Sequence, residues 1–132
     1  MVIPPVYVEF PQSGKSKQLL YPEKGISFDY VELEKRFDTI IPDIVVYSGD
    51  KYFFIEIYVT HHIDDEKLKK LKEKKICTIE IDLSKIKRDI SVEELSDILL
   101  NSSPQKSWKY HTESKKWYRH FEKDASDELP LK

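Results

Sequence analysis

Alternating apolar and polar positions make the middle of the chain the centre of the predicted fold. The run YFFIEIYVT (residues 52–60) is the strongest strand candidate. Every second residue of this run belongs to one wholly apolar face: Phe53, Ile55, Ile57 and Val59. The opposite face carries an acid, Glu56, among residues that are otherwise prone to burial. Because a buried carboxylate needs a partner, this strand is where we first expect chemistry.

The segments before this strand predict an antiparallel hairpin. Residues 39–47 form a run rich in β-branched side chains, and the turn signal Ser48-Gly49-Asp50 follows it. Residues 27–36 (SFDYVELEKR) fit a short helix and a strand equally well, since neither periodicity prevails. Nearer the N-terminus, residues 6–10 (VYVEF) have alternating faces and are bounded by prolines, which predicts a short strand.

The segments after the strand predict a crossover connection. Residues 64–75 have acids first and lysines later, the order that suits a helix dipole. Residues 76–83 (ICTIEIDL) predict a strand, so a right-handed crossover with parallel pairing is expected. We interpret Glu80 and Asp82 as polar-face and capping residues, with Glu80 able to approach Glu56. Ser91 and Glu94 form a capping box at the start of a further helix.

The tail from residue 106 to residue 123 interleaves basic and aromatic side chains. It can be drawn as a hairpin whose strands are residues 107–111 and 116–121. Such a composition is typical of nucleic-acid surfaces, where aromatic rings stack on bases and lysines contact phosphates. For Trp108 and Trp117, however, packing is the favoured interpretation.

Composition limits the function classes further. The 132 residues (15.7 kDa) predict one domain, with a core of about 26–100 and a C-terminal extension, 101–132. A single cysteine, Cys77, excludes an internal disulfide and a zinc site built from cysteines of one chain. No segment approaches the ~20 apolar residues of a membrane span, and the N-terminus lacks a signal-peptide pattern. We therefore expect a cytoplasmic protein with no membrane partner.

Two acids are predicted to meet on the hairpin. If the chain turns at residues 48–50, Asp43 lies approximately opposite Glu56 on one face. Like charges in this position destabilise a sheet unless a cation lies between them. Carboxylate oxygens favour Mg²⁺ or Mn²⁺, ions that keep water and substrate phosphate in their remaining positions. The spacing thus indicates a metal site that could act on a phosphate.

These residues resemble a known group of enzymes. Pro42-Asp43 followed by Glu56-Ile57-Tyr58 looks like the PD-(D/E)xK nuclease superfamily. More narrowly, residues 31–84 are similar to the competence-protein (CoiA-like) nuclease domains. Those domains carry the pattern V-x-x-E-K-R, P-D and I-E-I-x-V-T-H, then a helix and I-E-I-D-L-S.

The resemblance implies a restriction-endonuclease-like αβββαβ core with a mixed sheet, which binds Mg²⁺ or Mn²⁺ and hydrolyses DNA phosphodiester bonds. Asp43 and Glu56 would be metal ligands, with the backbone carbonyl of Ile57, and Glu34 would come from the first helix. The expected catalytic set is Glu34, Asp43, Glu56, Tyr58, Thr60 and His61. Nucleases of this superfamily often pair to cut two strands, so a homodimer is also expected.

Tyr58 departs from the pattern, because the superfamily most often has a lysine at this position. An unperturbed tyrosine, with a pKa of about 10, is a poor base. Lys67, Lys70 or His61 could substitute for the missing lysine, and the sequence leaves the choice open. The alternative is a catalytically impaired module with a nuclease fold that binds nucleic acid or a protein partner.

Overall fold

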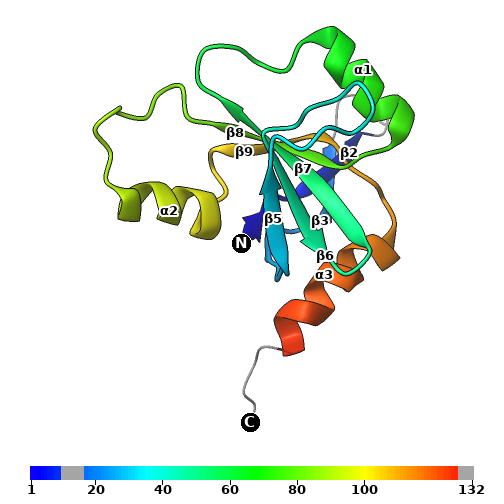
Figure 1. Cartoon of the computed structure of the whole chain (residues 1–132). Coiled ribbons are helices and arrows are strands. Elements are labelled where there is room, and N and C mark those ends of the chain that lie inside the picture. Colours follow the sequence, from blue (N-terminus) through cyan, green and yellow to red (C-terminus); the bar gives the residue numbers. More distant parts are fainter. Residues whose placement is uncertain (10–16, 128–132) are drawn as a thin grey trace.

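A five-stranded mixed sheet forms the centre of the computed structural model, which describes residues 1–9 and 17–127 (Figure 1). Its strands, in spatial and in sequence order, are β5 (Tyr30–Leu33), β6 (Ile44–Ser48), β7 (Lys51–Tyr58), β8 (Thr78–Asp82) and β9 (Lys106–Tyr110). The helices are α1 (Asp65–Lys74), α2 (Val92–Asn101) and α3 (Lys115–Asp127). Two small antiparallel pairs precede the sheet: β1 (Val2–Ile3) with β4 (Lys24–Gly25), and β2 (Val6–Glu9) with β3 (Lys17–Tyr21).

The central hairpin is confirmed. β6 and β7 pair antiparallel from Ile44 opposite Ile55 to Ser48 opposite Lys51. The two-residue turn has Gly49 at φ 61°, a left-handed conformation that glycine adopts without steric cost. β7 ends at Tyr58, two residues before the predicted end, so Thr60 lies outside the strand. The short N-terminal strand is also present as β2, while Phe10, its predicted last residue, lies outside the described residues.

The crossover after β7 is confirmed as well. β7 and β8 are parallel, with α1 between them in the chain. The Asp64 carboxylate caps α1 by accepting a hydrogen bond from the Lys67 backbone N–H at 2.7 Å. The predicted capping box is present at α2, where the Ser91 hydroxyl accepts from the Glu94 N–H at 3.1 Å.

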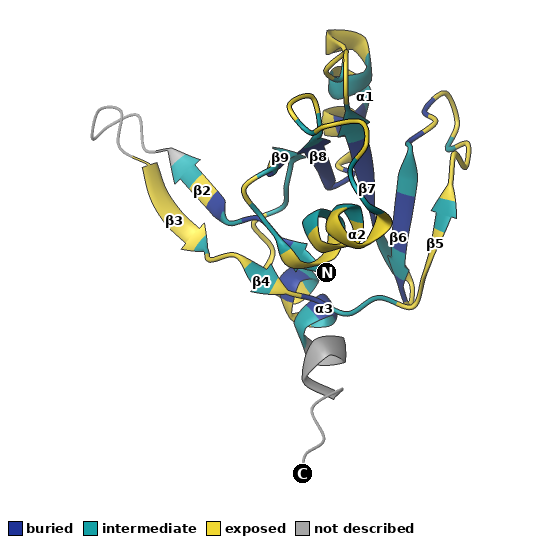
Figure 2. Ribbon diagram, turned by 90° about the vertical axis from the view of Figure 1, so that its left-hand side faces the viewer, coloured by how far each residue is buried: buried dark blue, intermediate teal, exposed yellow. Residues whose placement is uncertain are grey.

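The two faces of the sheet have separate hydrophobic cores. One face packs against α3 and the N-terminal strands through buried side chains that include Ile3, Val6, Phe53, Ile55, Ile79, Tyr118 and Phe121. The other face packs against α1 through Ile40, Val45, Phe54, Leu71 and Ile76. Figure 2 shows the buried segments on β6, β7 and β8, with exposed residues along β5 and β3. α1 therefore covers the face that carries Glu56.

The predicted C-terminal hairpin is wrong in its second half. Residues 106–110 are strand β9, but the residues predicted as its partner strand lie in helix α3. Trp117 and Phe121 are four residues apart, which places both on one helical face. Their rings pack against Phe53 with centroids at 6.0 and 5.4 Å. The helical spacing brings both aromatic rings onto the apolar face of the sheet around Phe53. This packing favours a helix over a strand.

The helix that the resemblance implied within residues 27–36 is also absent. This segment contains β5, which pairs antiparallel with β6 from Tyr30 opposite Tyr47 to Leu33 opposite Ile44. Of the described residues before β5, none is helical. From β5 to β8 the order is strand, strand, strand, helix, strand, and the helix expected at the start of the αβββαβ core is absent from the described residues. The periodicity of this segment fitted both a helix and a strand, and pairing with the β6 backbone decides for the strand.

Candidate functional site

The carboxylates of Asp43 and Glu56 each accept a hydrogen bond from the backbone of the opposite segment of the β6–β7 hairpin. The Asp43 N–H donates to Glu56 Oε2 at 2.7 Å, and the Ile57 N–H donates to Asp43 Oδ2 at 2.7 Å. Asp43 immediately precedes β6, so the register that pairs Ile44 with Ile55 continues to Asp43 and Glu56. The predicted proximity of these acids is confirmed. Ile57 meets Asp43 through its N–H group.

Lys67 supplies the cation at this site. Its ammonium group, in the first turn of α1, donates to Glu56 Oε1 and also to the Ile41 carbonyl at 3.1 Å. Burial raises the pKa of Glu56, and the nearby Asp43 charge adds to the rise. Hydrogen bonds from Lys67 and from the Asp43 N–H, with the Lys67 charge, act in the opposite direction. Among the three substitutes that the sequence left open, Lys67 is the one bonded to Glu56.

Lys70 and His61 lie differently. Lys70, one turn further along α1, pairs with Glu66 at 3.5 Å. His61 lines the same pocket as Glu56, but its Nδ1 is engaged with the Thr60 hydroxyl at 2.8 Å in an exposed pair. Both residues are therefore further from direct contact with the acids than Lys67.

Glu80 is buried, so its interpretation as a solvent-facing polar residue is wrong, whereas its expected approach to Glu56 is confirmed. It is the register partner of Glu56 on the parallel strand β8. Its Oε1 contacts His62 Nδ1 at 3.0 Å and Lys109 Nζ at 3.4 Å, while Oε2 accepts from the Ile63 N–H at 3.3 Å. Because register partners of parallel strands point to the same side of a sheet, both acids face the α1 side.

Glu56, Glu80 and Lys67 line a small pocket of about 140 Å³, and Asp43 is not among its lining residues. Its lining includes Glu56, Ile57, His61, His62, Lys67 and Glu80. Two carboxylates and one ammonium group on a buried floor can bind a cation, a water molecule or a phosphate oxygen. The pocket is therefore polar and the right size for an ion and its waters rather than for a large apolar ligand.

Three further predicted residues lie outside this arrangement. Tyr58 is half-buried, and its ring stacks on His62 with centroids 3.7 Å apart. Thr60 is exposed beyond the end of β7. Glu34 is exposed after β5, and its N–H donates to the Asp43 carbonyl at 3.1 Å. Within residues 1–9 and 17–127 no hydrogen bond or ion pair joins the Glu34 carboxylate to Asp43 or Glu56.

Sequence reasoning missed Lys109 and His62 as partners of Glu80. Lys109 was assigned to the aromatic-basic tail, and only the pairing of β9 with β8 brings it beside Glu80. A usable signal existed for Glu80 itself, because parallel pairing after a crossover places ICTIEIDL next to FFIEIY. Parallel pairing of the two strands was expected, but the local pattern did not fix which residues lie opposite each other.

The donor set suits a hard divalent ion held by two carboxylates. Magnesium is commonly bound by one or two carboxylates plus waters and substrate phosphate, and Asp43 and Glu56 match that number. In the described part of the chain, no three His, Cys, Asp or Glu side chains lie close enough together to hold a metal by themselves. Such an ion would need water or substrate to complete its coordination.

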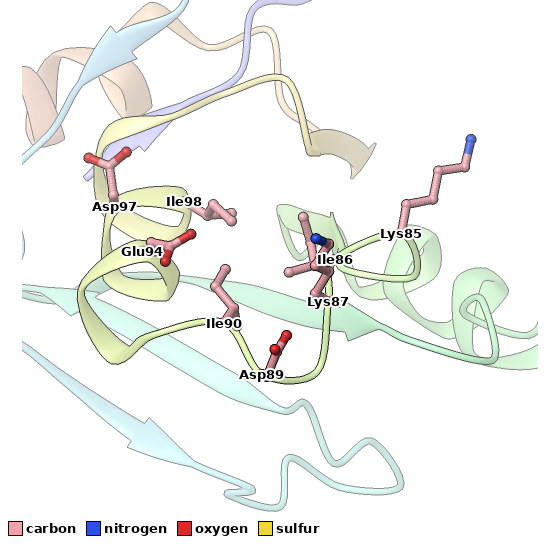
Figure 3. Close-up of a pocket in the computed structure, with 8 residues that line it drawn as sticks. All are labelled: Lys85, Ile86, Lys87, Asp89, Ile90, Glu94, Asp97 and Ile98. Atoms are coloured by element: carbon pink, nitrogen blue, oxygen red, sulfur yellow. The ribbon is translucent and has the colours of Figure 1, made fainter.

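A second pocket, of about 590 Å³, lies between α2 and the loop that follows β8 (Figure 3). It combines three isoleucines with charges of both signs: Ile86, Ile90, Ile98, Lys85, Lys87, Asp89, Glu94 and Asp97. None of the acids of the β7–β8 cluster lines it. The mixed charges single out no ligand chemistry.

No helix among the described residues is long and apolar enough to cross a membrane. Comparison of the chain with models of protein families, with curated proteins and with solved structures finds no match.

Proposed function

We propose that the chain is a metal-dependent nuclease that hydrolyses phosphodiester bonds of DNA, with a core like that of the PD-(D/E)xK superfamily. The observation that carries this proposal is the ion pair between Lys67 and Glu56, beside Asp43. The superfamily motif has a lysine close to the metal-binding acid, and this chain has Tyr58 at that position. In the folded chain, a lysine from α1 reaches the same acid.

The proposal assigns separate roles to these side chains. Asp43 and Glu56 would hold Mg²⁺ or Mn²⁺, which when bound would activate water and polarise the scissile phosphate. Lys67 provides a fixed positive charge at the pocket, where it stabilises negative charge that develops on the phosphate oxygens. His61 lines the same pocket and is exposed, so it is available to contact the substrate. Lys109 neutralises Glu80, which also contacts His62 Nδ1, and Lys67 is left to Glu56.

The first test is metal binding, because it does not require the substrate to be known. Calorimetric titration with Mn²⁺ and Mg²⁺ should show binding to the wild type and none to Asp43→Asn/Glu56→Gln. These substitutions keep side-chain size while removing both charges. A matched control is Asp97→Asn/Glu94→Gln, which removes two acids from the pocket at α2 and should leave binding unchanged. Equal binding by all three proteins would contradict the site.

The second test is cleavage. Linear and circular DNA and single-stranded RNA should be incubated with the wild type and with the Asp43→Asn/Glu56→Gln variant in the presence of Mg²⁺ or Mn²⁺. We expect metal-dependent cleavage of DNA by the wild type alone. Cleavage that survives in the variant would show that the nuclease activity does not depend on these acids.

A second candidate is a module of the same fold that binds nucleic acid without cutting it. The observation in its favour is that both Glu56 oxygens already accept hydrogen bonds from protein donors, one from Lys67 and one from the Asp43 N–H. A carboxylate in such a network can serve stability alone. Binding of nucleic acid with no metal uptake would favour this candidate over the nuclease.

A further inference from the structure

A second basic site lies at the far end of α1 from Glu56. A pocket of about 410 Å³ is enclosed by the β6–β7 turn, the C-terminal end of α1 and the residues that precede and begin α3. Four lysines line it: Lys51, Lys74, Lys75 and Lys116. The only acid among its lining residues is Asp50. We refer to this site as the basic pocket.

Most of the positive charge in the basic pocket is not neutralised by the protein. Lys74 pairs with Asp38 at 3.2 Å, across an exposed surface. In the described part of the chain, Lys51, Lys75 and Lys116 make no ion pair. Ammonium groups gathered around one hollow repel one another and create a positive potential that attracts anions. The pocket is thus suited to a ligand with several negative charges.

The uncharged lining fits a phosphate group as well. Thr112 and Ser114 carry hydroxyls that can donate hydrogen bonds to phosphate oxygens. Trp117 adds an aromatic surface beside them. Lysines, hydroxyls and an aromatic ring are the side chains that contact phosphates and stack on bases in proteins that bind single strands.

Lys75 is held at the basic pocket at a conformational cost. It follows α1 in the left-handed conformation, with φ 56° and ψ 45°, and its N–H bonds the carbonyls of Leu71 and Lys72. Glycine is the usual residue here, because a side chain in the left-handed conformation is sterically unfavourable. A lysine at a glycine position places a charge at the pocket where local stability alone would favour glycine.

We infer that the basic pocket binds a backbone phosphate of a nucleic-acid strand. The course of α1 supports a strand: Lys67 in its first turn bonds Glu56, and Lys74, its last residue, lines the basic pocket. At 1.5 Å per residue these two lysines are about 10 Å apart along the helix, which corresponds to roughly three phosphates along one strand of a duplex at ~3.4 Å each. The choice of a strand over a small phosphate rests on the proposed function, whereas the affinity for phosphate does not.

The test compares two double variants that lose the same charge. Lys51→Gln/Lys116→Gln removes two lysines of the basic pocket. Lys85→Gln/Lys87→Gln removes two exposed lysines of the loop after β8 and serves as the control. Binding of a fluorescein-labelled single-stranded oligonucleotide is followed by anisotropy with a chelator present, so that cleavage does not interfere.

The pocket variant should bind about tenfold more weakly at low salt, and the control less than about twofold. The slope of log Kd against log salt should fall by about 0.7 in the pocket variant, the value for one lost phosphate contact on a single strand. Equal weakening and equal slopes in the two variants would overturn the inference. Unchanged circular dichroism confirms that both variants are folded.

Two further measurements separate the alternatives. Tripolyphosphate titrated into the wild type tests a small ligand, with Trp117 fluorescence as the readout. If tripolyphosphate binds while oligonucleotide affinity is the same with and without Lys51 and Lys116, a strand is excluded. The two proposals fail separately, because they are tested by different measurements. Cleavage by the Asp43→Asn/Glu56→Gln variant tests the nuclease site, and oligonucleotide binding by the Lys51→Gln/Lys116→Gln variant tests the basic pocket.

Discussion

Glu56 and Glu80 are neighbours on the parallel strands β7 and β8, and both are buried, with 7% and 3% of their surface exposed. Two buried carboxylates this close destabilise a sheet unless each has a cation. The protein provides one to each: Lys67 from α1 to Glu56, and Lys109 from β9 to Glu80. The lysines that neutralise the two acids thus come from elements far apart in the sequence, α1 and β9.

Removing Lys109 should destabilise the fold. In Lys109→Met, Glu80 keeps only His62 and the Ile63 N–H as partners, and a buried charge loses its only lysine. We expect the free energy of unfolding to fall by about 1–3 kcal/mol in urea titrations. Lys85→Met removes an exposed lysine and should change it by less than about 0.5 kcal/mol. Equal stability of the two variants would show that Glu80 does not depend on Lys109.

Removing Lys67 should affect cleavage far more than removing Lys70. Lys67→Ala takes away the cation at Glu56, and we expect the cleavage rate to fall on the order of 100-fold at saturating metal. Lys70 is paired with Glu66 instead, so Lys70→Ala should retain most of the activity. A similar loss in both variants would indicate that α1 acts through its general charge.

Metal affinity should depend on pH through Glu56. Burial raises the pKa of this carboxyl above its ordinary 4.5, so protons compete with the metal at higher pH than for an exposed glutamate. Apparent Mn²⁺ affinity should therefore rise with pH over a range that lies above the titration range of an exposed glutamate. Calorimetry at several pH values measures this, together with release of a proton on binding. A flat profile over that range would mean that Glu56 is already ionised or is not a ligand.

Lys75→Gly should raise stability and weaken anion binding at the same time. Glycine relieves the left-handed strain, so the free energy of unfolding should increase by up to about 1 kcal/mol. Oligonucleotide affinity should fall, because the basic pocket loses one charge. The same substitution inside the helix, Lys72→Gly, should lower stability by about 1 kcal/mol. If Lys75→Gly changes only stability, Lys75 does not contact the ligand.

Lys106 should make stability depend on pH in the alkaline range. Its ammonium is buried, with hydrogen bonds only to the Val2 and Leu99 carbonyls at 2.6 and 2.7 Å, and burial lowers its pKa to about 8. The unfolded chain holds this proton up to about pH 10.5, so between those values the unfolded state binds more protons than the folded state. The cost of burying the charge is fully present below pH 8 and is relieved as the pH rises.

The wild type should therefore gain stability relative to Lys106→Met from about pH 8 to about pH 10.5. Urea unfolding of both proteins across this range measures the difference, and Lys87→Met, at an exposed position, serves as the control. Parallel stability profiles for the wild type and Lys106→Met would contradict an unusually low pKa at Lys106.

The local pattern of the sequence determined the β6–β7 hairpin, the crossover through α1 and the caps of α1 and α2. Each of these depends on neighbouring residues: alternation in β7, the glycine turn at Gly49, and acids at the first turns of the helices. Because the hairpin register follows from its turn, the approach of Asp43 to Glu56 could also be predicted.

Tertiary structure decided the segments whose local pattern was compatible with two conformations. Within residues 27–36, Tyr30–Leu33 became a strand because β6 offered an unpaired edge. Residues 115–127 became a helix because Trp117, Tyr118 and Phe121 could cover the face of the sheet around Phe53. The periodicity of a segment gives no information about these packing partners, because they lie tens of residues away in the sequence.

The cations of the site were likewise a matter of tertiary structure. Lys67 was one of three candidates in the sequence, and Lys109 was not assigned to the site. The distance from α1 to β7, and the pairing of β9 with β8, selected them. The sequence by itself placed the acids, whose separation is short and fixed by one turn. The tertiary structure determines which lysines pair with these acids. Those contacts form between elements distant in the sequence, which come together because both faces of the sheet are buried.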